Sequence, residues 1–563
     1  MTPETVGRRP ITVVELQQPN QAGTGVIRWL FMDARGGVFN LGDYSNPDDI
    51  RCDPLPCLLS VSTSSNEINA GSNMDGRSPL GVTGKVTVTM QDFAWNRAFG
   101  DEPTVGQVSG KAPPVLANFW ALWTARHDLF NNMFIVVYDG YEGQSLDDMR
   151  KRLHVLDSVD GPNGDGKVTL KGLDPMRLAG DKKAEFPRTS SLDLYGDISA
   201  TDTSITLFGL EDDLSDSFGN TGAVKYFSIG SEIIRYMGYT DAGNGRFALS
   251  GVVRGALGTN AEDHSDLDKV QRAGRYEKIS FWLVLEDLFK NHTAMPHEFI
   301  PVDDWNAEGN TYLPTYKATR TVVKPTVVSK LAGEITQQGL FYIWWAEYEM
   351  EIKMLAIRAP DEVPIELNDE SHLMRGTVLK RDPSMRTTQV AVYYNQINPF
   401  TGDSSENFKN RFTAINGDNE GETRVVSIYA PWITNRTQAV QLAMRLLIRY
   451  RATPLFLSVT IDAKDREATV GKVVDITTRT IIDPDDGSVK QTRWQVISAK
   501  EIKAGHTYAL NCQTYEFLGK FGRYMADGSP NYPEATDEQK RTGAFYAGDD
   551  GLLSDGKEGY KYQ

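Results

Sequence analysis

A glycine-rich stretch is the first place in this sequence where residue types and spacing could do chemistry. Residues 161–168 combine several glycines with Lys167 in nearly the order that cradles phosphates in nucleotide-binding loops. Val168 stands where such a loop places its magnesium-binding serine or threonine, and a strand pattern follows where a helix is required. We therefore predict a hairpin turn here rather than a nucleotide site.

The candidate metal ligands in this sequence do not have the spacing that known calcium and zinc sites require. Asp160, Asn163 and Asp165 depart from the alternation of calcium-loop ligands, and no glutamate follows at the required distance. His297 and Glu298 lack the second histidine of a zinc-protease helix. The sequence therefore predicts no bound metal and no cofactor.

The sequence also lacks a clear pattern of catalytic residues. Paired carboxylates such as Glu286 and Asp287 arise by chance among 75 acidic residues and indicate solvated acidic faces. Neither a Gly-x-Ser-x-Gly elbow nor a cysteine–histidine signature occurs. The adjacent Trp344 and Trp345 resemble a sugar platform, but in a strand they more often point one into the core and one into an interface. We expect a protein that is not an enzyme.

The three cysteines leave an odd thiol, which is poor material for a disulfide framework. An iron–sulfur cluster usually needs four thiolates, so we expect Cys52, Cys57 and Cys512 to be buried thiols. The first residues lack the basic start and apolar core of a signal peptide. The longest apolar span, residues 441–450, is interrupted by arginines, so we expect no membrane crossing.

The sequence pattern predicts that most of the chain forms β-strands. Residues 85–90 and 152–157 alternate with period two, and glycine-containing turns recur at short intervals, as in sandwiches and barrels. A hairpin is predicted from residues 227–239 and 247–253, because the Asn-Gly pair between them tolerates the positive φ of a tight reversal. Residues 60–81, rich in Ser, Asn and Gly, are predicted to be a loop.

Two helices interrupt the strands. Thr326 is placed to cap one that runs through Gln338, with Gly339 as its terminator. Thr434 or Asn435 is placed to cap a second helix, whose apolar face and basic end reach Tyr450.

The length and net charge of the chain limit the number of domains and the classes of function that are expected. A chain of 563 residues is too long for one hydrophobic core, so several domains are expected. The formal net charge of -16 argues against DNA binding by phosphate neutralisation. We expect no sequence-specific nucleic-acid binding.

A glycine-containing loop follows the predicted hairpin. Its notable residues are Arg254, Gly255, Gly258, Thr259 and, after a short gap, His264. From the residues alone this is an ordinary loop with one solvated histidine. The stretch nevertheless resembles a signature of tail-hub proteins of long-tailed, siphophage-like bacteriophages. Residues 119–174 and 339–394 resemble further stretches of the same family, in the same order along the chain.

The resemblance implies a mainly β fold with α+β parts: two barrel-like tube domains, a small inserted β domain and an αβ domain. We place an N-terminal β-rich hub domain at residues 1–185, the inserted β domain at 186–273 and an α+β domain at 274–390. A second β-rich domain with one helix follows at 391–525, and a polar C-terminal tail at 526–563.

The resemblance also implies a function. It implies a homotrimer at the tail tip of the virion, assembled in the host cytoplasm, that closes the distal tail tube and opens for DNA ejection. Its implied partners are the distal tail protein, the tape-measure protein and a tail fibre or receptor-binding protein. The alternative is a tail-associated cell-wall or surface-glycan hydrolase, and a third reading is a non-viral carbohydrate-binding or secretion-apparatus spike.

The C-terminal tail has few residues with which to build a core. Its aromatic residues favour docking on a partner over pure disorder. The candidate docking residues are Tyr532, Phe545, Tyr546, Tyr560 and Tyr562.

Overall fold

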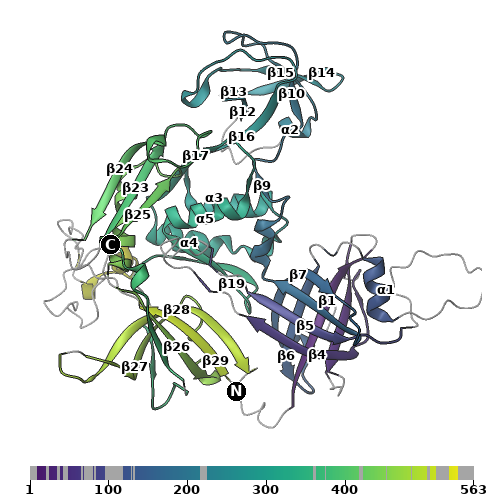
Figure 1. The fold of residues 1–563 in the computed structure, drawn as a ribbon, viewed down its shortest axis with the longest axis vertical. Coiled ribbons are helices and arrows are strands. Elements are labelled where there is room, and N and C mark those ends of the chain that lie inside the picture. Colours follow the sequence, from purple (N-terminus) through teal and green to yellow (C-terminus); the bar gives the residue numbers. More distant parts are fainter. Residues whose placement is uncertain are drawn as a thin grey trace, which may run out of the picture.

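The computed structural model describes most of the chain. The described residues are 9–20, 24–33, 39–41, 48–64, 67–68, 80–81, 84–95, 118–127, 130, 133–215, 225–358, 363–374, 376–416, 423–451, 453–483, 485–503, 507–514, 530 and 532–542. The fold is mainly β and multidomain, as predicted. Figure 1 shows three β lobes around a central group of helices.

The N-terminal lobe is a closed barrel. Its strands are β1 (Pro10–Pro19), β2 (Val26–Asp33), β3 (Ile50–Arg51), β4 (Leu55–Ser64), β5 (Lys85–Gln91), β6 (Phe134–Tyr141), β7 (Arg150–Asp160) and β8 (Lys167–Leu173). The sheet order is β1-β6-β7-β8-β5-β4-β2-β3, and β1 also pairs with β2, which closes the ring. The glycine-rich stretch of residues 161–166 is the turn between β7 and β8, which confirms the predicted hairpin.

Strand alternation gives this barrel two apolar surfaces. Val14 and Val137 point into the barrel core, whereas their neighbours Val13 and Val136 join a second core outside it. The short helix α1 (Phe119–Arg126) contributes three fully buried aromatic side chains to the barrel core. Residues 60–64 belong to strand β4, so the loop predicted from residue 60 begins too early.

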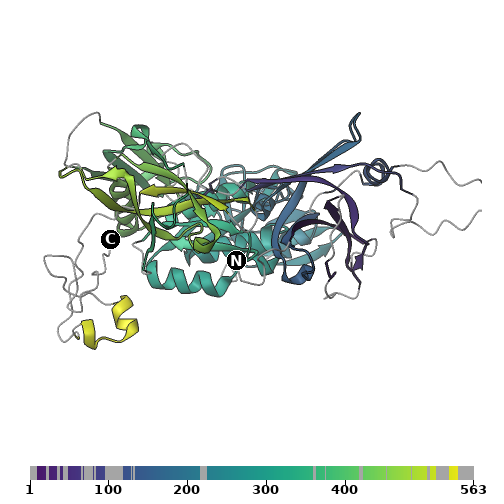
Figure 2. The ribbon, with the colours of Figure 1, turned by 90° about the horizontal axis from the view of Figure 1, so that it is seen from below.

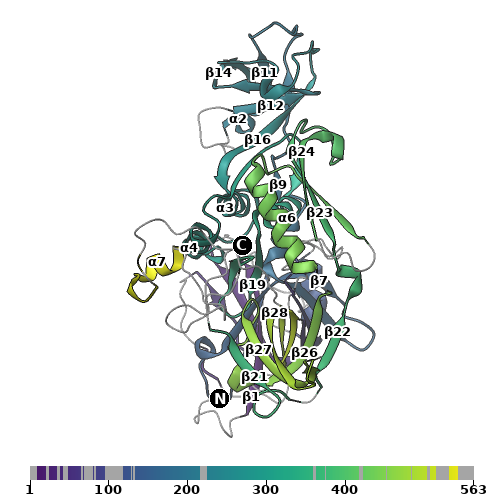
Figure 3. The ribbon, with the colours of Figure 1, turned by 90° about the vertical axis from the view of Figure 1, so that its left-hand side faces the viewer.

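The inserted lobe is a separate sheet with its own core. Its elements are β10 (Leu192–Leu194), β11 (Thr206–Phe208), α2 (Asp212–Ser215), β12 (Lys225–Ile229), β13 (Glu232–Tyr236), β14 (Gly238–Gly243), β15 (Arg246–Ser250) and β16 (Lys269–Ser280), with β17 (Lys317–Val322) paired to β16. Figure 3 shows β16 running from this lobe towards the central helices.

The predicted hairpin in this lobe is correct at its turn and wrong at its first strand. Asn244 and Gly245 both adopt positive φ between β14 and β15. Residues 227–239 do not form one strand, because a reversal at Gly230 and Ser231 separates β12 from β13. The extra reversal brings Glu232 to the start of a buried strand.

The centre holds helices α3 (Phe281–His292), α4 (Val302–Tyr312) and α5 (Val328–Gly339), the hairpin of β19 (Phe341–Ala346) and β20 (Glu351–Ala356), and the small pair β9 (Glu185–Phe186) and β18 (Thr326–Val327). Thr326 lies in β18, and the residue that precedes α5 is Val327, so the predicted cap is wrong. Trp345 is buried and Trp344 is partly exposed, as expected for adjacent tryptophans in a strand.

The C-terminal part has two sheets. Helix α6 (Arg436–Tyr450) packs against β23 (Gln389–Gln396) and β24 (Phe408–Ile415), which form a three-stranded sheet with β25 (Val425–Ala430). The other sheet is open, in the order β21 (Ile365–Asn368), β27 (Val473–Ile482), β28 (Val489–Lys503), β29 (Thr507–Thr514), β26 (Leu455–Asp462) and β22 (Val378–Arg381). Figure 2 shows this sheet on the left and the N-terminal barrel on the right of the molecule.

Helix α6 begins as predicted, with Asn435 Oδ1 accepting a hydrogen bond from the Thr437 N–H at 2.8 Å. Its basic end is not a solvated one. Arg445 and Arg449 are buried, and Arg445 donates to the Ile357 carbonyl at 2.9 Å. No helix among the described residues is long and apolar enough to cross a membrane.

Candidate functional site

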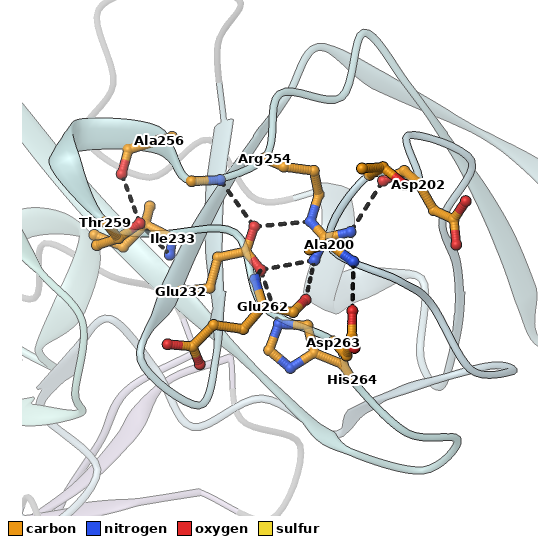
Figure 4. A network of polar contacts seen from close by, with 12 residues as sticks. Ala200, Asp202, Glu232, Ile233, Arg254, Ala256, Thr259, Glu262, Asp263 and His264 are labelled. Atoms are coloured by element: carbon orange, nitrogen blue, oxygen red, sulfur yellow. Dashed lines mark hydrogen bonds and ion pairs between the residues drawn. The ribbon is translucent and has the colours of Figure 1, made fainter.

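The loop that carries the sequence signature wraps around one buried carboxylate. Glu232, at the start of β13, is fully buried, and its side chain lies under the loop that follows β15 (Figure 4). Arg254 donates to both of its oxygens, at 2.7 and 2.8 Å. The Gly255 N–H donates to Oε1 at 2.8 Å.

Two further groups contact the same carboxylate. The Glu262 N–H lies 3.1 Å from Oε2, and His264 Nε2 lies 2.8 Å from it. Burial alone would raise the pKa of Glu232, but the hydrogen bonds from Arg254, Gly255, Glu262 and His264 outweigh it and lower this pKa to about 2. A carboxylate offers about four lone-pair sites, so Glu232 is saturated and unsuited to act as a base.

Arg254 also forms hydrogen bonds with backbone carbonyls of neighbouring segments. Its guanidinium donates to the carbonyls of Ser199 at 2.7 Å, Asp202 at 3.0 Å and Glu262 at 2.5 Å. One side chain therefore joins three segments of the inserted lobe. A planar guanidinium with five N–H donors suits this task, whereas a lysine ammonium has only three.

The remaining signature residues shape the loop. Thr259 Oγ1 donates to the Ala256 carbonyl at 2.9 Å and accepts from the Ile233 N–H at 3.0 Å. Gly255 and Gly258 have φ of 59° and 85°, in the left-handed region that favours glycine. At Gly255 a Cβ would also lie 2.9 Å from the Thr259 carbonyl oxygen. Both glycines are therefore needed for the path of the chain.

His264 is not the solvated histidine expected from its residue type. It is buried, its ring contacts Glu232, and its backbone pairs with Ile198. Sequence reasoning missed Glu232 itself. The available signal was one acidic residue directly before the apolar pair Ile233 and Ile234, because such a carboxylate needs a partner when its strand is buried.

This arrangement can anchor a loop, and the described residues add no nucleophile to it. Within the described part of the chain, no hydroxyl or thiol side chain hydrogen-bonds to His264. No group of three or more histidine, cysteine or acidic side chains there is placed to hold a metal ion. The signature residues therefore work together as a carboxylate-centred loop clamp, formed by Glu232, Arg254, Gly255, Glu262 and His264.

The other candidate residues lie elsewhere. Tyr532 belongs to a short turn of helix, Tyr532–Glu534, before α7 (Asp537–Thr542), which Figure 2 shows away from the packed body. Phe545, Tyr546, Tyr560 and Tyr562 lie outside the described residues. Cys57 and Cys512 are buried and Cys52 is partly buried. Burial raises the pKa of Cys52 to about 11 and that of Cys512 to about 12.

Fold and site together define a mainly β, multidomain protein with a closed barrel, an open second sheet and a clamped inserted lobe. No family model matches the chain, and no curated protein matches its sequence. Three solved structures similar to this chain are tail proteins. The 43 kDa tail protein of prophage MuSo2 from Shewanella oneidensis is 9% identical, with 90% of this chain and 98% of that chain covered and a TM-score of 0.36.

The tail protein from Neisseria meningitidis MC58 is 7% identical, with 90% of this chain and 96% of that chain covered and a TM-score of 0.37. The prophage tail protein gp18 from Listeria monocytogenes EGD-e is 9% identical, with 81% of this chain and 88% of that chain covered and a TM-score of 0.30.

Proposed function

We propose that this chain is a structural component of a bacteriophage tail tip. The observation that carries the proposal is the presence, in one chain, of a closed barrel and an open curved sheet side by side, next to a group of helices. The resemblance of three ordered stretches of sequence to siphophage tail hubs supports the same role. Three copies of such a chain supply the repeated sheets of a pseudo-sixfold ring that continues the tail tube.

In this role the homotrimer closes the distal end of the tube and opens for DNA ejection. Its partners are the distal tail protein, the tape-measure protein and a fibre or receptor-binding protein. The formal net charge of -16 fits a channel wall past which DNA slides without being held. The polar C-terminal tail docks on a neighbouring subunit or a fibre protein.

The test is the copy number and position of the chain in intact particles. Mass measurement of released tail tips, together with an electron-microscopy map of the tip, is expected to show three copies in a ring at the distal end of the tube. A single copy per particle, or a location on the tail shaft or head, contradicts the proposal. Deletion of residues 526–563 is expected to leave the hub folded and to remove a partner from the tip.

The alternative, a tail-associated glycan hydrolase, requires a carboxylate pair with access to substrate. Glu232, the buried carboxylate under the signature loop, is saturated by its donors. We expect the purified chain to leave peptidoglycan and lipopolysaccharide glycan intact. Turnover that one carboxylate substitution abolishes supports the hydrolase instead.

A further inference from the structure

A cavity of about 740 Å³ lies between the β19–β20 hairpin and the open C-terminal sheet. Apolar lining comes from Trp344, Met354 and Val470, and the ring of Trp344 lies against Gly471, where a Cβ would approach it to 2.8 Å. The volume is within the range of cavities that hold small ligands or a few side chains. Of the sequence patterns discussed above, the Trp344–Trp345 pair contributes to its lining.

Glu347 places in the lining of this cavity a carboxylate that has no hydrogen-bonding partner among the described residues. It follows β19, lines the cavity, and forms no hydrogen bond or ion pair with any described residue. Burial raises the pKa of Glu347, and the nearest cations, Arg152 and Arg150, are engaged by Asp139 and Glu501. A carboxylate in such surroundings favours a hydrogen-bonding or cationic partner.

The other charges of the lining leave an acidic surplus. Glu349 and Glu467 also line the cavity, together with the cations Lys353, Arg358 and Lys472. Lys353 is paired with Glu351, and Arg358 with Glu308 at 2.8 Å. Since these two cations already have carboxylate partners, the cavity is complementary to a positively charged group.

The rim of the cavity favours a polypeptide over a small molecule. Val363 lines it and is 92% exposed, so the rim of the cavity is open to a partner. Two residues later β21 begins, and Ile365, its first residue, also lines the cavity. Among the described residues β21 pairs on one side only, with β27, so its other edge offers backbone groups to an added strand.

From this juxtaposition we infer that an extended basic segment of a partner protein adds to the free edge of β21 and places a lysine or arginine side chain in the cavity beside Glu347. Backbone pairing along β21 supplies affinity, and the Glu347 carboxylate selects the cation. The stem of the cationic side chain lies along Trp344. The inference stands apart from the proposed tail role, and its failure leaves that role untouched.

Fluorescence anisotropy with labelled hexapeptides tests this inference on the full chain. The probes alternate threonine and valine and differ only in one central residue, which is lysine, glutamine or glutamate. A single charge limits non-specific attraction to this acidic chain. We expect the lysine peptide to bind at least about tenfold more tightly than the glutamine peptide, as befits one charge-assisted hydrogen bond, and the glutamate peptide not to bind.

Variants locate the binding. Glu347→Gln is expected to remove the preference for lysine, whereas Glu406→Gln, at an exposed position outside the cavity, is expected to leave it unchanged. Thermal melting of both variants shows whether they fold. Should Glu347→Gln fail to fold, a Met354 methyl resonance that shifts with the lysine peptide and not with the glutamine peptide locates the binding instead.

Three results overturn the inference. These are equal affinity for the lysine and glutamine peptides, no binding of any peptide, and a lysine preference that survives Glu347→Gln. Tighter binding of tetra-N-acetylchitotetraose than of the lysine peptide, lost in Glu347→Gln, assigns the cavity to a saccharide and overturns it as well.

Discussion

Arg150 and Glu501 are 351 positions apart in the sequence, yet their side chains form an ion pair of 2.6 Å. The pair joins β7 of the N-terminal barrel to β28 of the open sheet. Tyr348, in the turn of the β19–β20 hairpin, completes the contact: its hydroxyl donates to Glu501 at 3.0 Å and its ring lies 4.2 Å from the Arg150 guanidinium. Three parts of the chain therefore meet at one polar junction.

Glu501→Gln is expected to loosen this junction without unfolding either sheet. The Glu501 side chain is nearly buried, so losing its charge weakens hydrogen bonds worth about 2 kcal/mol. Hydrogen exchange should become faster in residues 341–356 and unchanged inside the barrel core. The exposed Glu406→Gln is the control, and equal exchange in both variants contradicts the prediction.

Glu232→Gln should destabilise the inserted lobe. The substitution leaves the buried Arg254 guanidinium without its opposite charge, and losing one partner of a buried pair costs about 3 to 5 kcal/mol. Hydrogen exchange over residues 192–270 measures the effect separately from the other domains. Glu262→Gln is a matched control, because it keeps the Glu262 backbone contacts to Glu232 and Arg254. Equal protection in the two variants would refute the role of the clamp.

The same carboxylate predicts a response to acid. Its folded pKa of about 2 lies below the ordinary value of 4.5, so the unfolded lobe binds the extra proton first. The contribution of Glu232 is therefore fully present above about pH 4.5 and is lost as pH falls towards 2. Exchange protection of residues 192–270 should fall over this interval in the natural chain and change less in Glu232→Gln. Parallel pH profiles count against the prediction.

For Asp174 we predict the opposite dependence of stability on pH. It is buried between the N–H groups of Gly84 and Met176, and burial raises its pKa to about 7. Because the folded pKa is raised, its contribution is present below about pH 4 and is lost as pH rises through 7. Asp174→Asn keeps an acceptor and avoids the buried charge, so the melting temperature of this variant, relative to that of the natural chain, should rise as pH increases from about 4 to 7. A constant difference would rule this out.

The N-cap of helix α6 allows a simple test of a local contribution to stability. Asn435 satisfies the Thr437 N–H at the start of α6, and replacing such a cap by alanine costs about 1 kcal/mol. Asn435→Ala should lower the melting temperature, and Asn435→Ser should restore most of it. Failure of serine to restore stability would show that the side chain acts through another contact.

These cases also show what the sequence could predict. The cap of α6 and the Asn244–Gly245 turn were predictable because each depends on residues a few positions apart. The clamp was not, since Glu232 meets partners 22 to 32 positions away that converge only after the lobe has folded. The buried state of Arg449 depends likewise on contacts with Gln495 and Gln513, in strands β28 and β29.

The two ends of the inserted lobe lie side by side. Leu192 in β10 pairs with Val270 in β16, so the chain departs and returns through one antiparallel stalk. Both residues belong to the apolar core of the lobe, and the clamp residues lie in the chain between them. A foreign module whose termini form a similar pair of strand ends can therefore be grafted in its place without moving the barrel, the open sheet or the helices. In evolutionary terms the stalk is an exchange point, where the chain can acquire a new peripheral domain while its framework stays constant.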